Sequence, residues 1–280
     1  MNITPRVAAV HDMSGLGRCS LAVILPVLSA MGAQCCPMQT AYLSAHTAFP
    51  ASDESAFYDL TAAMAQTIRH WKELKVSFDA VYSGFLGSAR QISLLSEGID
   101  TFRQKDTLVL VDPVMGDNGK LYRTYTPEMC RRMAKLAEKA DLITPNVTEA
   151  AILLGEDLRD MPRDENAFRD WLVRLSRNGR RSVVITGVSL ASGQVGAGVL
   201  CRESGGIGFF MDSEEPGCFS GTGDLFAAVL LGALLRGENL ADASKRAVAF
   251  VRRCAAYTIK LGAPVLDGVN FESQLRHLIV

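Results

Sequence analysis

Short apolar runs rich in β-branched residues alternate with longer amphipathic stretches through the first two thirds of the chain. The runs lack the polar/apolar alternation of a half-exposed strand, which favours strands buried on both faces of a parallel sheet. We predict such strands at Val7–Val10, Ala33–Met38, Ala80–Phe85, Leu108–Val111, Leu142–Thr144 and Ser182–Thr186. Strands that alternate with helices are typical of a doubly wound α/β domain.

The helices between these strands have readable start signals. Thr126 places an N-cap residue before Pro127 and Glu128, a first-turn proline and an acid. Asp164 begins a further helix that Gly179 can close. These signals indicate that the amphipathic stretches are helices.

The pattern changes after Gly187, where two short strands and two long helices are expected. The strands, Gly196–Cys201 and Gly206–Met211, are joined by a glycine-containing loop, which predicts a hairpin. The helices are expected at about Thr222–Arg236 and Leu240–Leu261. Residues 1–280 contain no repeat, low-complexity tract or linker, so we predict a single domain with an antiparallel edge on its sheet.

Composition and charge exclude several classes of protein. Hydrophobic residues make up 48% of the chain and charged residues 21%, which suits a large packed core rather than a disordered chain. The formal net charge is -1, whereas a nucleic-acid-binding protein or a polybasic membrane-surface protein is expected to carry an excess of positive charge. The longest apolar runs, Leu21–Leu28 and Leu225–Leu235, fall short of the ~20 residues that span a bilayer, and no signal peptide is expected.

The cysteines are odd in number and scattered, without a CxxC pair. They are Cys19, Cys35, Cys36, Cys130, Cys201, Cys218 and Cys254. This pattern favours free thiols over a disulfide framework or a zinc site, and it predicts a cytoplasmic protein.

Chemistry is expected beyond the carboxyl ends of the strands, where open parallel sheets bind ligands. Gly221-Thr222-Gly223-Asp224 leads directly into an entirely apolar helix. The glycines allow consecutive N–H groups to point at one anion, and the helix start adds a partial positive charge. An acid at Asp224 could then accept a proton from a nucleophile that attacks phosphorus. An ordinary glycine turn with an N-terminal helix acid explains the segment equally well.

Two further segments carry acids. Asp112 ends a strand and Asp117 lies in the following loop, an arrangement that suits Mg²⁺ beside a phosphate, although a solvated turn is the commoner explanation. Asn146 and Glu149 have the spacing of a capping box at a helix start. The same pair could contact phosphate and a metal ion, and the two functions are compatible.

The segment after the first strand, His11–Ser20, contains Gly15 and Gly17 but lacks the third glycine of a dinucleotide fingerprint. We therefore reject a dinucleotide site and expect a polar substrate pocket there. His11 and His46 are single histidines that could equally be structural.

Taken together and in this order, these segments resemble the ribokinase superfamily, and within it the pyridoxal kinases. Gly221–Asp224 resembles the superfamily's anion hole and catalytic aspartate, and Asp112–Asp117 and Ala140–Asn146 with Glu149 resemble its vitamin-kinase branch. Ser83–Ser88 and Leu43–Thr47 are similar to pyridoxal kinase pocket segments. The resemblance extends over nearly the whole chain.

The resemblance implies a ribokinase-like domain with a central, mostly parallel sheet flanked by helices, and ATP-dependent phosphorylation of the 5′-hydroxymethyl group of pyridoxal, pyridoxine or pyridoxamine. It implies Asp224 as the base and the N–H groups of Gly221, Thr222 and Gly223 as the anion hole. It also implies Mg²⁺, a monovalent cation such as K⁺, and a homodimer. The residues implied in the phosphate and cation region are Asp112, Asp117, Thr144, Asn146 and Glu149, with Tyr122 and Thr186 at ATP and Thr47 and Phe85 at the pyridine ring.

The chain departs from the family in the segment after the first strand. His11-Asp12-Met13 stands where the family usually has Gln-Ser-His, and the following glycine motif also differs. Asp12 could therefore favour an amine substituent or a protonated ring nitrogen.

Three alternatives remain. A hydroxymethylpyrimidine (phosphate) kinase is the nearest, but that branch generally has cysteine after Gly-Thr-Gly, where this chain has Asp224. Sugar kinases of the superfamily carry a β-sheet lid, and the stretch from Met38 to Phe85, expected to be mostly loop plus one helix, leaves little room for it. A non-catalytic B6-vitamer binding protein would have no use for Asp224 beside a phosphate cradle.

Overall fold

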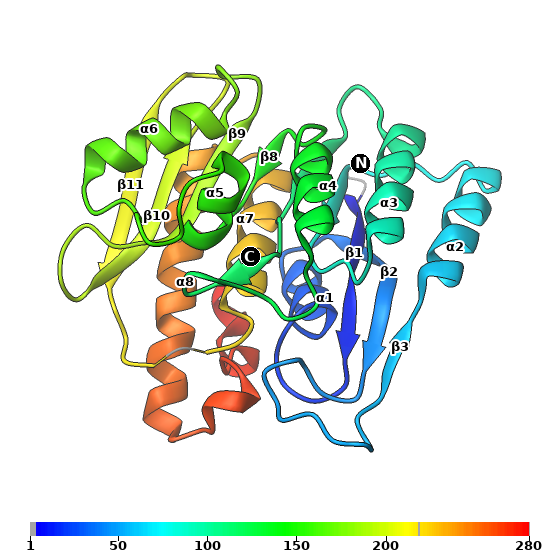
Figure 1. Cartoon of the computed structure of the whole chain (residues 1–280), viewed down its shortest axis with the longest axis horizontal. Helices are drawn as coiled ribbons and strands as arrows, with labels where there is room; N and C mark the ends of the chain where they lie inside the picture. The colour runs from blue at the N-terminus through cyan, green and yellow to red at the C-terminus, as the bar shows by residue number, and fades with distance from the viewer. Residues whose placement is uncertain (1–3, 218, 280) are drawn as a thin grey trace.

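One sheet of nine strands runs through the protein, in the order β11-β10-β9-β8-β5-β4-β1-β2-β3. The computed structural model describes residues 4–217 and 219–279 (Figure 1). The sheet strands are β1 Arg6–Ser14, β2 Gln34–Leu43, β3 Phe57–Asp59, β4 Ala80–Ser83, β5 Leu108–Val111, β8 Leu142–Ile143, β9 Ser182–Val188, β10 Gln194–Leu200 and β11 Ile207–Ser213. The six strands β9, β8, β5, β4, β1 and β2 pair in parallel, and β3, β10 and β11 are antiparallel. The predicted α/β class with a mostly parallel sheet is confirmed.

Helices cover both faces of the sheet (Figure 1). They are α1 Leu21–Ala30, α2 Thr61–Glu73, α3 Ala89–Phe102, α4 Pro127–Ala137, α5 Val147–Leu154, α6 Glu165–Leu175, α7 Thr222–Leu235 and α8 Leu240–Leu261. Successive residues of β1 point to opposite faces, so Val7 and Ala9 pack in one core with α1, α7 and α8, while Ala8 and Val10 pack in the other with α2 to α6. Because both faces of these strands are buried, their sequences are continuous apolar runs.

The predicted helix starts are confirmed by their caps. Thr126 accepts a hydrogen bond from the Met129 N–H at the start of α4, with Pro127 as the first helical residue. Asp164 caps α6 in the same way, although the helix ends at Leu175, before Gly179. Helix α7 begins at Thr222 and α8 spans Leu240–Leu261, as predicted. No helix in the described ranges is both long and apolar enough to span a bilayer.

The stretch from Met38 to Phe85 was expected to be mostly loop plus one helix, and this is wrong at its start. Strand β2 continues to Leu43, and Phe57–Asp59 return as the short antiparallel edge strand β3. All three β3 residues are exposed, so the apolar periodicity that marks a buried strand is missing there. The addition extends the main sheet by one strand. The predicted hairpin of β10 and β11 is confirmed.

A second, two-stranded hairpin, β6 Gly116–Asp117 and β7 Lys120–Leu121, follows β5. It occupies the segment that was expected to be the loop carrying Asp117, which lines the cavity described below. Six cysteines are free thiols, and Cys218 lies outside the described residues.

Candidate active site

A cavity of about 1230 Å³ opens at the carboxyl ends of the parallel strands. Every candidate residue from the sequence lines it: Asp12, Thr47, Phe85, Asp112, Asp117, Tyr122, Thr144, Asn146, Glu149, Thr186, Gly221, Thr222, Gly223 and Asp224. The strand order explains this convergence, because β1, β4, β5, β8 and β9 are neighbours and all point the same way. Segments far apart in the sequence thus meet at one edge.

Asp224 lies in the first turn of α7, on the floor of this cavity. Its Oδ2 accepts a hydrogen bond of 2.7 Å from the backbone N–H of Ser20. The pKa of Asp224 is raised to about 7, mainly by burial, which outweighs the lowering effect of the Ser20 N–H, and to a smaller extent by the charge of the nearby Asp12. A carboxyl group whose pKa lies near neutrality is well suited to accept a proton.

The turn before Asp224 forms an anion cradle. Gly221 has φ of 80°, and a side chain there would place its Cβ 2.0 Å from the Arg18 carbonyl oxygen, so only glycine fits. The first N–H groups of a helix have no partner within the helix, and they carry the positive end of its dipole. Because α7 is buried from Leu225 to Ala233, the N–H groups of Thr222 and Gly223 at its start are held in fixed directions.

Two acids, Asp112 and Glu149, lie near Asp224 beside the cradle. Burial raises the pKa of Asp112 well above its usual value, and the charges of Glu149 and Asp224 raise it further. Burial also raises the pKa of Glu149 to about 8. The buried hydroxyl of Thr144 has no hydrogen-bond partner among the described residues. Acids that repel one another, together with a free hydroxyl oxygen, fit a cation held between them.

The described residues contain no group of three or more His, Cys, Asp or Glu side chains that could hold a metal ion by themselves. Mg²⁺ usually keeps several waters and binds one or two carboxylates together with substrate phosphates. The acids of this cavity fit that mode of binding, in which phosphate supplies the remaining oxygens.

Glu149 and Asn146 form a complete capping box at the start of α5. Glu149 accepts from the Asn146 N–H through Oε2 (2.9 Å) and from the Met115 N–H through Oε1 (3.0 Å). The Asn146 side chain accepts from the Glu149 N–H and donates to the Gly116 carbonyl oxygen. The structural function of this pair is confirmed, and its bonds also tie the β6–β7 hairpin to the helix.

Asp117 is the last residue of β6, and Tyr122 directly follows β7. Asp117 is exposed and accepts from the backbone and side chain of the neighbouring Asn118. Tyr122 is 38% exposed and is anchored through its N–H to the Met115 carbonyl oxygen. Thr186, in β9, pairs with Asn146 through an isolated bridge. These residues border the cavity above the cradle.

The other end of the cavity is lined by Asp12, Thr47 and Phe85. Thr47 is exposed in the loop after β2, and Phe85 is half-buried after β4. Asp12 is buried, and its two oxygens accept from the hydroxyls of Ser20 (2.5 Å) and Ser14 (2.9 Å). The hydrogen bonds lower the pKa of Asp12, but the opposing effect of burial is larger and leaves it raised.

Sequence reasoning missed two parts of this site. Ser20 donates hydrogen bonds to both Asp12 and Asp224, and these contacts depend on a backbone conformation that the sequence does not reveal. Helix α8 contributes Val248, Val251, Arg252 and Ala255 to the cavity wall. Their spacing of three and four residues marks one face of a helix, so this signal was present in the sequence.

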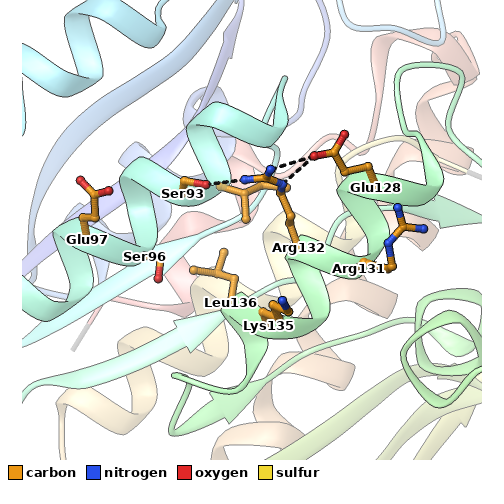
Figure 2. A pocket seen from close by; sticks show the side chains of 9 residues that line it. Ser93, Ser96, Glu97, Glu128, Arg131, Arg132, Lys135 and Leu136 are labelled. Atoms are coloured by element: carbon orange, nitrogen blue, oxygen red, sulfur yellow. Dashed lines mark hydrogen bonds and ion pairs between the residues drawn. The ribbon is translucent and has the colours of Figure 1, made fainter.

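A second hollow of about 620 Å³ lies on the outside of α3 and α4 (Figure 2). Arg132 reaches from α4 to the Ser93 hydroxyl on α3 while it also contacts Glu128 (Figure 2). None of the candidate residues lines this hollow, and its central arginine is already paired. It is a charged surface groove away from the carboxyl edge of the sheet.

Comparisons with known proteins agree with this geometry. The model of the phosphomethylpyrimidine kinase family matches residues 32–267. A Bacteroides thetaiotaomicron protein crystallised with pyridoxal is 39% identical, with a TM-score of 0.93 over 99% of this chain and 96% of the other. Pyridoxal kinase from Lactobacillus plantarum is 30% identical, with a TM-score of 0.88 over 99% and 97%.

Among curated relatives, pyridoxal kinase PdxY of Granulibacter bethesdensis is 26% identical over 84% of both chains. The alignment with a curated relative from Saccharomyces cerevisiae is shorter and spans 53% of that protein's length.

Proposed function

The chain belongs to the phosphomethylpyrimidine kinase family, and we propose that it transfers the γ-phosphoryl group of ATP to the 5′-hydroxymethyl group of pyridoxal, pyridoxine or pyridoxamine. The observation that carries this proposal is Asp224, a carboxylate with a pKa of about 7 beside the N–H groups at the start of α7. The resemblance to the pyridoxal kinases, first drawn from sequence motifs, is confirmed by the matching chains and structures.

The proposed reaction assigns each part of the cavity one task. The N–H groups of Gly221, Thr222 and Gly223 hold the γ-phosphate, and Asp224 accepts the proton of the vitamer hydroxyl. The hydroxyl oxygen forms the new bond to phosphorus, and the bond between phosphorus and the β–γ bridging oxygen breaks, so that ADP leaves with its electron pair. The γ-phosphate must therefore lie between the start of α7 and the vitamer.

Nucleotide and cations are assigned to the side of the cavity near α5. Asp117 and Glu149 would hold Mg²⁺ together with phosphate oxygens, and Asp112 would line the nucleotide side. The bound ion would supply positive charge to the transferring phosphate. Thr144 and Asn146 complete the phosphate region, where a monovalent cation such as K⁺ would also lie. Tyr122 and Thr186 would flank ATP from the β6–β7 hairpin and from β9.

The vitamer ring is assigned to the opposite end, between Thr47 and Phe85, with Asp12 below. Its 5′-hydroxymethyl group then points toward Asp224, because Asp12 and Asp224 are linked through a single residue, Ser20. We also propose that residues 1–280 act as one catalytic domain and that two chains form a homodimer.

The alternative substrate is hydroxymethylpyrimidine or its phosphate, which the name of the matching family favours. One experiment separates the possibilities: ATP and Mg²⁺ are supplied with pyridoxal, pyridoxine, pyridoxamine, hydroxymethylpyrimidine or ribose, and ADP and the phosphorylated product are measured. We expect stoichiometric turnover with a B6 vitamer. Turnover only with the pyrimidine would move the chain to the thiamin branch, and tight vitamer binding without ADP formation would make it a binding protein.

A further inference from the structure

Ser20 has an unusual backbone for a residue with a side chain. Its φ of 49° and ψ of -133° lie in a region that L-residues rarely adopt. Ser20 precedes α1 at the N-cap position, yet its hydroxyl makes no capping bond to that helix. A serine in this conformation usually persists only where the surroundings hold it, and such residues concentrate at functional sites.

The two hydrogen bonds of Ser20 lead to two carboxylates. Its N–H donates to Oδ2 of Asp224 at 2.7 Å, and its hydroxyl donates to Oδ1 of Asp12 at 2.5 Å. Asp12 is itself fixed by the Ser14 hydroxyl, which donates to Oδ2 at 2.9 Å. Within the described part of the chain no donor contacts Oδ1 of Asp224, so this oxygen remains available to accept a proton.

The loop that carries Ser20 is packed against the turn that begins α7. The Arg18 carbonyl oxygen lies where a Cβ on Gly221 would be, at 2.0 Å, and the Arg18 N–H donates to the Asp267 carbonyl oxygen at 3.0 Å. A Cβ on Gly268 would also meet the Arg18 carbonyl oxygen, at 2.8 Å. Because backbone meets backbone at these glycines, the Ser20 N–H has little freedom to move relative to Asp224.

We propose that Ser20, anchored by Asp12, is the positioning residue of the catalytic base: it holds Oδ2 of Asp224 and thereby directs Oδ1 at the hydroxyl to be phosphorylated. This inference rests on the proposed kinase function and adds a task to Asp12, which anchors Ser20 in addition to lining the vitamer end of the cavity. The hydroxyl of Ser20 holds the backbone conformation, and the N–H of Ser20 holds the base.

The first test compares Ser20→Gly, Ser20→Ala and the wild-type protein. Glycine adopts the positive φ without strain but loses the bond to Asp12, and alanine loses the bond and keeps the strain. We expect kcat to fall by about 10-fold in the glycine variant and by up to about 100-fold in the alanine variant, the loss typical of small misplacements of a reacting group. KM for ATP should change little. Ser29→Ala, on the exposed side of α1, is the matched control for thermal stability.

The second test asks whether Ser20 acts through Asp224. Ser20→Gly is combined with Asp224→Asn, which keeps the size of the base and removes its proton acceptance, and residual turnover is measured with radiolabelled ATP. If Ser20 only positions the base, the double variant turns over as slowly as Asp224→Asn alone. A further 10-fold loss in the double variant would overturn the proposal, because Ser20 would then serve the phosphate cradle or the fold.

A third test checks the link between Asp12 and Ser20. Asp12→Ala and Ser20→Ala should cause similar losses in kcat, and their combination should lose no more than the larger of the two. Additive losses would overturn the link between Asp12 and Ser20. A failure of the proposed function is recognised separately, because the wild-type protein would then phosphorylate no B6 vitamer in the substrate panel. The Ser20 experiments are then run with whichever substrate is turned over.

Discussion

At the scale of single residues, the protonation of Asp224 controls the predicted chemistry. Its pKa is raised to about 7, and only the ionised carboxylate accepts a proton. We therefore expect kcat/KM to rise as the pH increases from 6 to 8 and to level off above that. Asp224→Asn should lower kcat by about 10²–10⁴-fold, the usual contribution of a general base, with ATP affinity largely kept. Near-normal turnover of the Asn variant would refute the assignment.

The same pKa makes a prediction about stability. Because the pKa of Asp224 in the folded protein lies above its unfolded value, its contribution to the free energy of unfolding is present at low pH and is lost as the pH rises through about 7. Asp224→Asn stays neutral throughout. The Tm of Asp224→Asn minus the Tm of the wild-type protein should therefore increase between pH 5 and pH 8. A difference that stays constant over this range would contradict burial of the charged carboxylate.

Asp12 leads to a prediction about substrate choice. Pyridoxamine alone brings an ammonium group at the substituent that differs among the vitamers, and a carboxylate facing that group would favour its binding. Asp12→Ser should then lower the ratio of kcat/KM for pyridoxamine to that for pyridoxal several-fold. An equal ratio in both proteins would mean that the two hydroxyl bonds of Asp12 account for its whole function.

At the scale of secondary-structure elements, the capping box of α5 leads to a prediction about the proposed metal site. Replacing Asp117 with Ala and Glu149 with Gln should raise the Mg²⁺ concentration for half-maximal activity by about 10-fold or more, a loss typical of residues that support a metal site. Met115 and Asn146 donate to different oxygens of Glu149, so Gln keeps one of these two bonds, whereas Glu149→Ala loses both and should lower Tm further. An unchanged Mg²⁺ concentration for half-maximal activity would mean that Asp117 and Glu149 serve only the turn and the helix cap.

The sequence predicted those elements whose physical signal is local. A buried parallel strand is a continuous apolar run, and Thr126 and Asp164 cap their helices as their residue types indicate. Strand β3 could not be predicted, because its exposed residues show no apolar face and it forms only through pairing with β2. Ser20 was missed for a similar reason, since its positive φ is imposed by packing between segments remote in the chain.

At the scale of the whole molecule, the order of the strands brings motifs that are far apart in the sequence to one cavity. Residues as distant as Asp12 and Asp224 meet because α1 packs against β1, which carries Asp12, and also against α7, which carries Asp224. The sequence could predict that the strand ends carry the chemistry. The proposed assignment of nucleotide to one end and vitamer to the other agrees with the structure, in which Tyr122 beside the β6–β7 hairpin and Thr47 after β2 both line the cavity.

The outer edge of the same sheet supports the proposed homodimer. Strand β3 pairs with β2 on one side and ends the sheet on the other. Tyr42, Phe57 and Tyr58 are 41%, 48% and 62% exposed there, and the two tyrosine rings stack at 6.2 Å. Exposed apolar edge strands are usually protected from pairing, and a second copy of the chain would cover this one by a symmetric contact.

This arrangement would also help to close the active site, because β2 continues into the Leu43–Thr47 segment that lines the vitamer end of the cavity. We expect a dimer by light scattering at micromolar concentration and a shift toward monomer in Phe57→Lys/Tyr58→Lys. Val173→Lys, at an exposed apolar residue of α6, is the control. The monomeric variant should show a raised KM for the vitamer with little change in KM for ATP, since only the vitamer end adjoins β2. A wild-type monomer with full activity would overturn both the dimer and its part in substrate binding.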